Sequence, residues 1–125
     1  MEFIEAPAFS RYLSDYLADE EYRELQGRLA LNPELGDLIP GTGGFRKLRW
    51  ADPRRRKGRR GGLRIIYYYF MGEQRVWLMT LYDKDEASDL TPKEKKALRS
   101  ALEAELKARQ GGQLQRRRNP GGQGR

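Results

Sequence analysis

The sequence predicts an α+β protein in which helices pack on one face of a small twisted antiparallel sheet. Three observations lead to this fold class. Apolar residues recur at helical spacing near the start of the chain, follow the patterns of strands between Phe45 and Tyr82, and return to helical spacing after Thr91. Helices that flank a run of strands are typical of a sandwich of this class.

A short strand and two helices are predicted before Pro33. Residues 2–5 alternate weakly, and Pro7 suits the first turn of a helix because its missing N–H costs nothing there. An apolar stripe at helical spacing follows, formed by Phe9, Tyr12, Leu13, Tyr16 and Leu17. We expect a second helix with Asp19 as its N-cap, ending where Asn32 precedes Pro33.

The middle of the chain predicts three antiparallel strands. Residues 33–44 contain two prolines and four glycines and are interpreted as a loop. The next strand, from Phe45 to Trp50, places Phe45, Lys47 and Arg49 on one face and Arg46, Leu48 and Trp50 on the other. Residues 63–70 and 75–82 are apolar on both faces, which predicts central strands joined as a hairpin.

A last helix is predicted to begin with a capping box formed by Thr91 and Glu94, with Pro92 between them. Its buried stripe would be Leu98, Ala101, Leu102 and Leu106. Gly111 and Gly112 are expected to end it. We therefore expect a folded domain over residues 1–110 and a disordered basic tail rich in Gly, Arg and Gln over 111–125.

Composition and charge narrow the function. The chain of 125 residues contains no Cys and no His, which excludes disulfides, thiolate or imidazole metal sites and any triad that uses histidine. The net charge is −6 over residues 1–37 and +9 over residues 38–64. A basic centre of this kind favours a polyanionic partner such as nucleic acid, although a solvated basic loop is the plain alternative. With no long apolar run and an acidic start, the expected compartment is the cytoplasm.

A cationic group is predicted on one face of the sheet. Lys47 and Arg49 leave the same face of their strand, and Arg64 begins the next strand, where we expect its side chain to be exposed to solvent. Clustered cations are hard to explain as structure because unpaired buried charge is costly, yet salt bridges to the acidic helices are an alternative. The glycines of residues 40–44 do not form a phosphate loop, since a strand follows them and no Gly-Lys-Ser/Thr ending is present.

Three separated motifs carry a resemblance to a known family. They are GDLIPGTGGFRKLRW, KGRRGGLRIIYYYF and LMTLYDKDEASDLTPKEKKAL, preceded by the helical segment YLSDYLADEEYRELQ. In this order and spacing they resemble HigB-type toxins of the RelE superfamily, from bacterial toxin-antitoxin modules, over about residues 2–108. The resemblance implies a RelE-like fold that agrees with the predicted sandwich.

The resemblance also implies an activity and partners. Such a toxin is a ribosome-dependent endoribonuclease that cleaves translated mRNA through attack by the 2′-hydroxyl, without a metal or other cofactor, and so inhibits translation. It is neutralised by a HigA-type antitoxin with a helix-turn-helix domain, and we expect the toxin alone to be monomeric. The implied catalytic residues are Lys47, Arg49, Arg64, Lys84 and Tyr82. Residues expected to bind RNA are Arg46, Arg54, Arg55, Arg56, Lys57, Arg59 and Arg60.

Two points stay open at the level of sequence. Some relatives carry Tyr or His near the chain end, whereas this chain has Leu90 there, so Tyr82, Lys84 and Asp85 are all candidates for proton transfer.

The alternative function is a module that binds RNA or the ribosome without catalysis, which would use the same basic sheet. An anionic membrane is a weaker alternative, because the basic residues do not follow one face of an amphipathic helix.

Overall fold

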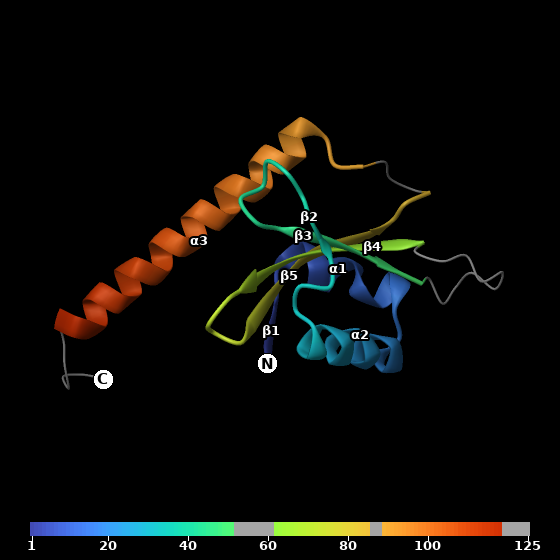
Figure 1. Ribbon diagram of the computed structural model, residues 1–125, viewed down its shortest axis with the longest axis horizontal. Helices are drawn as coiled ribbons and strands as arrows, with labels where there is room; N and C mark the ends of the chain where they lie inside the picture. The colour runs from blue at the N-terminus through green and yellow to red at the C-terminus, as the bar shows by residue number, and fades with distance from the viewer. Residues whose placement is uncertain (52–61, 86–88, 119–125) are drawn as a thin grey trace. The chain divides into compact units, whose positions relative to one another are not determined.

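The computed structural model describes residues 1–51, 62–85 and 89–118, and for 111–118 it describes the helical backbone only (Figure 1). The chain divides into two compact units. The first contains residues 1–40 and 44–89, and the second contains residues 41–43 and 90–125. The first unit holds the sheet and two helices, which together confirm the α+β class.

The sheet has five strands in the order β1-β5-β4-β3-β2. Its centre is the predicted antiparallel trio of β3 (Arg46–Trp50), β4 (Leu63–Phe70) and β5 (Arg75–Asp83). The first strand, β1 (Glu2–Glu5), pairs parallel to β5, and the Ala6 N–H continues that ladder with a 2.9 Å bond to the Leu78 carbonyl. The sheet is therefore mixed rather than wholly antiparallel, which corrects one part of the prediction.

One strand lies inside the segment predicted as a loop. β2 (Asp37–Leu38) pairs antiparallel with β3, and the Ile39 N–H bonds to the Phe45 carbonyl at 2.9 Å. Two residues are too few to show a period of two in the sequence, and only the neighbouring strand makes them a strand. β2 therefore depends on long-range pairing, which explains why the prediction missed it.

Two helices cover one face of the sheet, as predicted (Figure 1). α1 (Pro7–Tyr16) begins with the proline, and α2 (Asp19–Leu31) follows after two residues. The N-cap of α2 is Ala18 rather than Asp19, and the Glu21 carboxylate accepts a 2.6 Å bond from the Ala18 N–H. Starting one residue earlier places Asp19 in the first turn, where its charge interacts favourably with the helix dipole.

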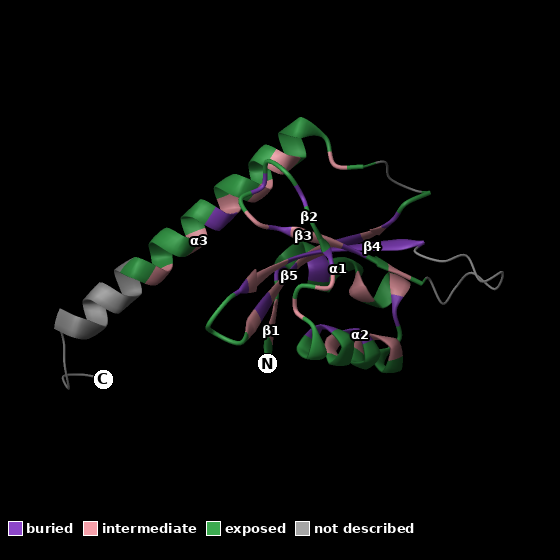
Figure 2. Cartoon of the chain, viewed as in Figure 1, coloured by how far each residue is buried: buried purple, intermediate pink, exposed green. Residues whose placement is uncertain are grey.

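The core lies between these helices and the sheet. Phe9 of α1 and Leu25 and Leu29 of α2 are fully buried against alternate residues of the central strands. Those strand residues are Leu48, Leu63, Ile65, Tyr67, Val76, Leu78 and Leu81. Figure 2 shows the resulting concentration of buried residues along β4. Since successive strand side chains alternate, the strand residues that lie between them, such as Lys47, Arg49 and Arg64, face away from the helices.

The second unit contains α3 (Pro92–Arg118). Its capping box is present, because the Thr91 hydroxyl accepts a bond from the Glu94 N–H at 3.1 Å and the Glu94 carboxylate accepts one from the Thr91 N–H at 2.8 Å. The helix does not end at Gly111 and Gly112 but continues to Arg118, which corrects the predicted end of the helix. A glycine inside a helix costs only about 1 kcal/mol, and Gln, Leu and Arg favour helix on its far side. The tail beyond 118 lies outside the described residues.

Tyr67 anchors the loop that leads to β2. Its buried hydroxyl accepts a 2.9 Å bond from the Gly36 N–H and donates a 2.7 Å bond to the Pro33 carbonyl. Burial raises the pKa of Tyr67 above its ordinary value of 10. The phenol therefore stays protonated in the folded state, and its contribution to stability is complete below pH 10 and falls as the pH rises through the higher folded-state pKa.

We expect Tyr67→Phe to lower the free energy of unfolding by about 1 to 3 kcal/mol, because Gly36 and Pro33 would lose their buried partner. Urea unfolding at pH 7 would measure the loss. The matched control is Tyr12→Phe, which removes the same hydroxyl from a side chain on the surface of α1. Equal stability of the two variants would contradict the anchoring role.

Candidate active site

The predicted cations gather on the sheet face that points away from α1 and α2. Arg49 of β3 pairs with Arg64 of β4, and Arg64 pairs with Tyr82 of β5. The three residues form one row across three adjacent strands, which we call the reactive row. Neighbouring strands lie about 4.8 Å apart, so the row spans roughly 10 Å from Arg49 to Tyr82. Lys47 lies in the next row on the same face, opposite Ile66.

Tyr82 belongs to this row because of an irregularity in the hairpin. Near the turn, Phe70 pairs with Arg75 and Tyr67 with Leu78, but the register shifts between Tyr67 and Ile66. Continuing the first register would have paired Arg64 with Leu81. One extra residue on β5 instead places Tyr82 opposite Arg64.

Lys47 has two acidic neighbours. Its Nζ lies 3.3 Å from a carboxylate oxygen of Asp89, and its backbone pairs with Asp37 of β2. Asp89 is highly exposed, with 84% of its side chain accessible, so the ion pair is of the kind that contributes little to stability. The sequence also allowed a salt bridge between Lys47 and an acidic helix. In the structure both acidic neighbours of Lys47 lie outside the helices.

Arg49 and Arg64 differ in exposure. Arg49 is exposed and forms no ion pair with another residue in the described parts of the chain. Arg64 is only 9% exposed, and its guanidinium donates a 3.2 Å bond to the Leu63 carbonyl. The expectation that Arg64 is exposed to solvent was wrong, because β4 is the middle strand and has a paired neighbour on both sides.

Lys84 and Asp85 lie beyond the end of β5. The Lys84 N–H bonds to the Gly62 carbonyl at 2.9 Å, which extends the ladder by one residue past Leu63 and Asp83. Both Lys84 and Asp85 are exposed, and the Asp85 N–H bonds to the buried Asp83 carboxylate at 2.8 Å. The alternation of a strand puts Lys84 on the same face as Tyr82, adjacent to the reactive row.

Arg46 is placed on the other face. Its guanidinium donates to the carbonyls of Glu34 at 3.2 Å and Gly36 at 2.7 Å, and so it holds the loop before β2. The structure thus separates Arg46 from Lys47 and Arg49. The other six residues expected to bind RNA lie outside the described residues, namely Arg54, Arg55, Arg56, Lys57, Arg59 and Arg60.

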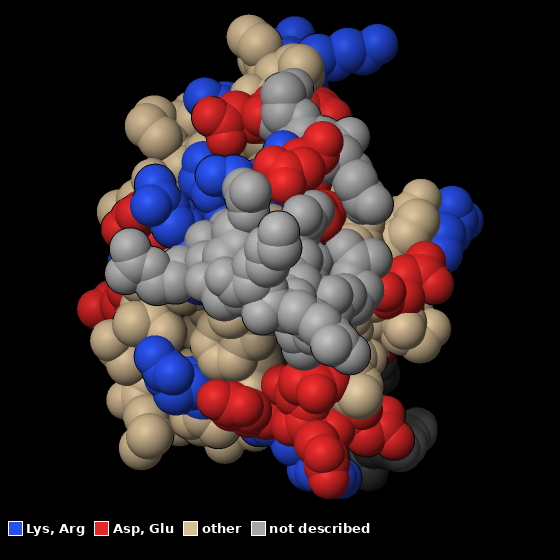
Figure 3. All heavy atoms as spheres, turned by 90° about the vertical axis from the view of Figure 1, so that its right-hand side faces the viewer, with Lys and Arg blue, Asp and Glu red and all other residues tan. Residues whose placement is uncertain are grey.

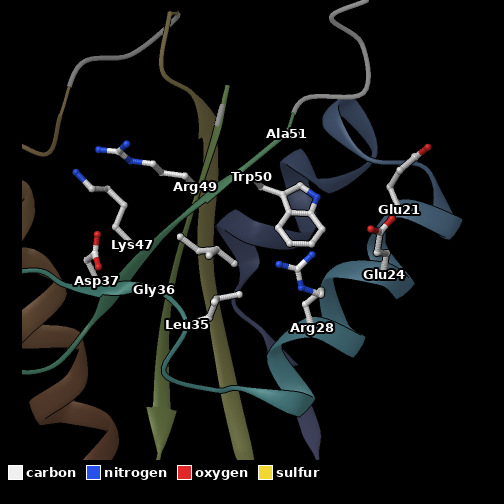
Figure 4. Close-up of a pocket in the computed structure, with 11 residues that line it drawn as sticks. Glu21, Glu24, Arg28, Leu35, Gly36, Asp37, Lys47, Arg49, Trp50 and Ala51 are labelled. Atoms are coloured by element: carbon white, nitrogen blue, oxygen red, sulfur yellow. The ribbon is translucent and has the colours of Figure 1, made fainter. Parts of the chain in front are cut away.

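A groove of about 530 Å³ runs beside the outer edge of β3 (Figure 4). Lys47 and Arg49 extend from one side of the strand, while Trp50 lies on the other side with Arg28 of α2, whose guanidinium is 5.6 Å from the centre of the Trp50 ring. The α2 wall carries Glu21 and Glu24. In Figure 3, acidic side chains gather along the lower edge of the molecule, over the start of α2.

Sequence reasoning missed the groove and the acidic neighbours of Lys47. Asp89 is 42 residues from Lys47 along the chain, and no local spacing links the two. The same holds for Arg28 and Trp50, which belong to elements predicted separately. In the described part of the chain, no three acidic residues are grouped so that they could hold a metal ion.

Comparison with known proteins found likenesses among solved structures. No protein-family model matches the chain. Among solved structures, the chain is similar to one from the crystal structure of the intact E. coli RelBE toxin-antitoxin complex, with 13% sequence identity and a TM-score of 0.47. The match covers 66% of this chain and 94% of that one. Neither comparison assigns the chain to a family, so the resemblance of its three motifs remains a prediction.

A search of the described helices for a membrane span found none with sufficient length and apolar character.

Proposed function

We propose that this protein is the toxin of a type II toxin-antitoxin module and acts as a ribosome-dependent endoribonuclease on translated mRNA. The observation that carries the proposal is the reactive row, in which Arg49, Arg64 and Tyr82 share one face of the sheet with Lys47 beside them. Guanidiniums can stabilise a phosphorane and a phenol can transfer protons, and phosphodiester cleavage needs both of these functions when histidine is absent. The resemblance of the three motifs to HigB-type toxins supports the same activity.

The proposed reaction uses the RNA's own nucleophile. The 2′-oxygen attacks the adjacent phosphorus, the bond from phosphorus to the 5′-oxygen breaks, and the products are a 2′,3′-cyclic phosphate and a 5′-hydroxyl. Arg64 stabilises the negative charge that develops on the phosphorane, while Lys47 and Arg49 position the phosphate. The route consumes no oxidant or reductant and needs no metal-bound hydroxide.

Proton transfer is assigned to Tyr82. A base must take the proton from the 2′-hydroxyl, and an acid must give one to the departing 5′-oxygen. Arginine cannot act as the base near neutral pH because its pKa stays above 12. Tyr82 is in the row itself, next to Arg64, whose positive charge would stabilise a phenolate. Lys84, which follows on the same face, is suited to donate a proton to the leaving oxygen.

The partners of the proposed toxin are a ribosome carrying mRNA and an antitoxin of the HigA type. The six basic residues between Arg54 and Arg60 would contact ribosomal RNA through its phosphates. Because binding of this kind releases counterions, we expect ribosome association to weaken steeply with salt.

Mapping of RNA 5′ ends after induced expression tests the proposal. We expect new 5′-hydroxyl ends inside translated messages, phased with the codons and absent from untranslated RNA. The alternative, a module that binds RNA or the ribosome without catalysis, would slow growth without producing such ends. A second check is to map the same message with its start codon removed, which should abolish the cuts.

A further inference from the structure

The helix side of the groove holds an arginine against a tryptophan ring. The Arg28 guanidinium lies 5.6 Å from the centre of the Trp50 ring, which is only partly buried (Figure 4). No residue in the described part of the chain accepts a hydrogen bond from this guanidinium or forms an ion pair with it. The planar fork of a guanidinium suits a partner that has two acceptors side by side. The pair therefore offers two hydrogen-bond donors next to an aromatic surface.

A carboxylate lies next to this arginine. Glu24 precedes Arg28 by four residues on α2, so the two side chains are neighbours on the surface of the helix. Both line the groove, yet they form no ion pair with each other. The Glu24 carboxylate accepts no hydrogen bond from a described residue, whereas the Glu21 carboxylate already accepts one from the Ala18 N–H. The groove wall thus presents one carboxylate and one guanidinium to a ligand.

These groups match the edges of one RNA base. Guanine has two adjacent donors on one edge, N1–H and the N2 amine, and two adjacent acceptors on another, O6 and N7. A carboxylate can accept from the donor pair, and a guanidinium can donate to the acceptor pair. Adenine, cytosine and uracil would each turn an acceptor toward the carboxylate. Unpaired bases are also bound by stacking on aromatic side chains, which Trp50 provides.

The same part of the groove adjoins the reactive row. Trp50 follows Arg49 on β3, and successive strand side chains point to opposite faces, so the two side chains flank the outer edge of the strand (Figure 4). β2 pairs with Arg46 and Lys47, and beyond Lys47 no described residue pairs with that edge. The groove volume of about 530 Å³ is within the range of about 300 to 1,000 Å³ for small-ligand sites. A nucleotide with its phosphate on Arg49 can therefore reach Trp50 with its base.

We propose that the groove beside Trp50 is a guanine-binding subsite. The base stacks on Trp50, Arg28 donates to O6 and N7, and Glu24 accepts from N1–H and the N2 amine. The ligand is a guanine nucleotide whose phosphate contacts Arg49. This inference rests on the proposed function in one respect, since the RNA substrate is then the source of the nucleotide. The carboxylates of the wall repel phosphate, which favours entry of the base rather than the RNA backbone.

A titration followed by NMR tests the subsite on the full chain. The probes are the trinucleotides UGU, UAU, UCU and UUU, with 2′-O-methyl groups that remove the nucleophile and so prevent cleavage. We expect UGU to shift the Trp50 indole N–H of the ¹⁵N-labelled protein. It should bind about tenfold more tightly than the other three, because each of those loses at least one bidentate pair. Guanosine monophosphate should bind more weakly than UGU, which distinguishes an RNA ligand from a free nucleotide.

Modified bases assign each contact. Inosine lacks the N2 amine and 7-deazaguanine lacks N7, so each should bind more weakly when it replaces guanosine in UGU. Glu24→Ala should remove only the preference for guanosine over inosine. Arg28→Lys should remove only the preference for guanine over 7-deazaguanine, because lysine keeps the charge but not the fork. The matched controls Glu20→Ala and Arg23→Lys change exposed residues of α2 outside the groove and should keep both preferences.

Several outcomes would overturn the subsite. They are equal binding of the four trinucleotides, a Trp50 signal that does not move at millimolar RNA, and guanine selectivity that survives both Glu24→Ala and Arg28→Lys. Binding of guanosine monophosphate as tight as that of UGU would overturn RNA as the source of the base.

The readout is independent of cleavage. Guanine binding without RNA cleavage in cells would retain the subsite and reject the proposed nuclease. Cleavage in cells without guanine binding, and without guanine beside the cuts, would reject the subsite alone.

Discussion

Arg64→Ala should reduce the rate of RNA cleavage by about 100-fold or more. Loss of one donor to a charged transition state typically costs about 3 to 4 kcal/mol. Arg64 lies between Arg49 and Tyr82 in the reactive row, so its loss leaves the centre of the row without a cation. Single-turnover cleavage of ribosome-bound mRNA would measure the rate, and growth arrest on induction would follow it in cells.

The burial of Arg64 requires a second variant. Because the residue is only 9% exposed, alanine also removes the packing of its aliphatic stem and lowers stability for a reason unrelated to catalysis. Arg64→Met keeps most of that stem and removes the charge. The matched control is Arg75→Ala, which deletes an arginine of β5 that forms an exposed ion pair with Glu2 at 2.7 Å. A folded Arg64→Met protein with full cleavage would falsify the assignment.

Local patterns in the sequence were sufficient to predict most of the helices and strands and to place Lys47 and Arg49 on one face of the sheet. Alternation over Phe45 to Trp50 predicted that Lys47 and Arg49 lie on the same side of a strand, and the structure adds that this side is opposite to the helices. The capping box at Thr91 and the apolar character of β4 and β5 were equally local signals. Each of these features is fixed by residues a few positions apart, which is the range at which periodicity and capping act.

Features that depend on distant pairing were not predictable. The register shift in the β4 and β5 hairpin decides whether Tyr82 or Leu81 lies opposite Arg64, and no glycine or other local signal marks it. β2 and the ion pair between Lys47 and Asp89 also depend on contacts between residues that are far apart in the sequence. The burial of Arg64 also followed from its place in the middle strand rather than from its position near the strand's start.

Tyr82→Phe should slow cleavage by about 100-fold or more while leaving ribosome binding unchanged. A positioned acid or base typically contributes 10² to 10⁴ to a rate, and phenylalanine preserves the ring while removing the group that transfers the proton. The matched control is Tyr68→Phe, because Tyr68 faces the same side of the sheet but pairs with Trp77, outside the reactive row. Cleavage rates measured at saturating protein would separate the chemical step from binding.

A modified substrate identifies which proton Tyr82 moves. When sulfur replaces the 5′-bridging oxygen, the leaving group departs as a thiolate and no longer needs an acid. If Tyr82 is the base, Tyr82→Phe should remain slow on this substrate, because the 2′-hydroxyl must still lose its proton. Lys84→Gln should then be slow on the normal substrate and recover on the sulfur substrate. Recovery of Tyr82→Phe instead would exchange the two roles, and full activity of Tyr82→Phe on both substrates would remove the phenol from the mechanism and leave Lys84 and Asp85 as the residues that transfer protons.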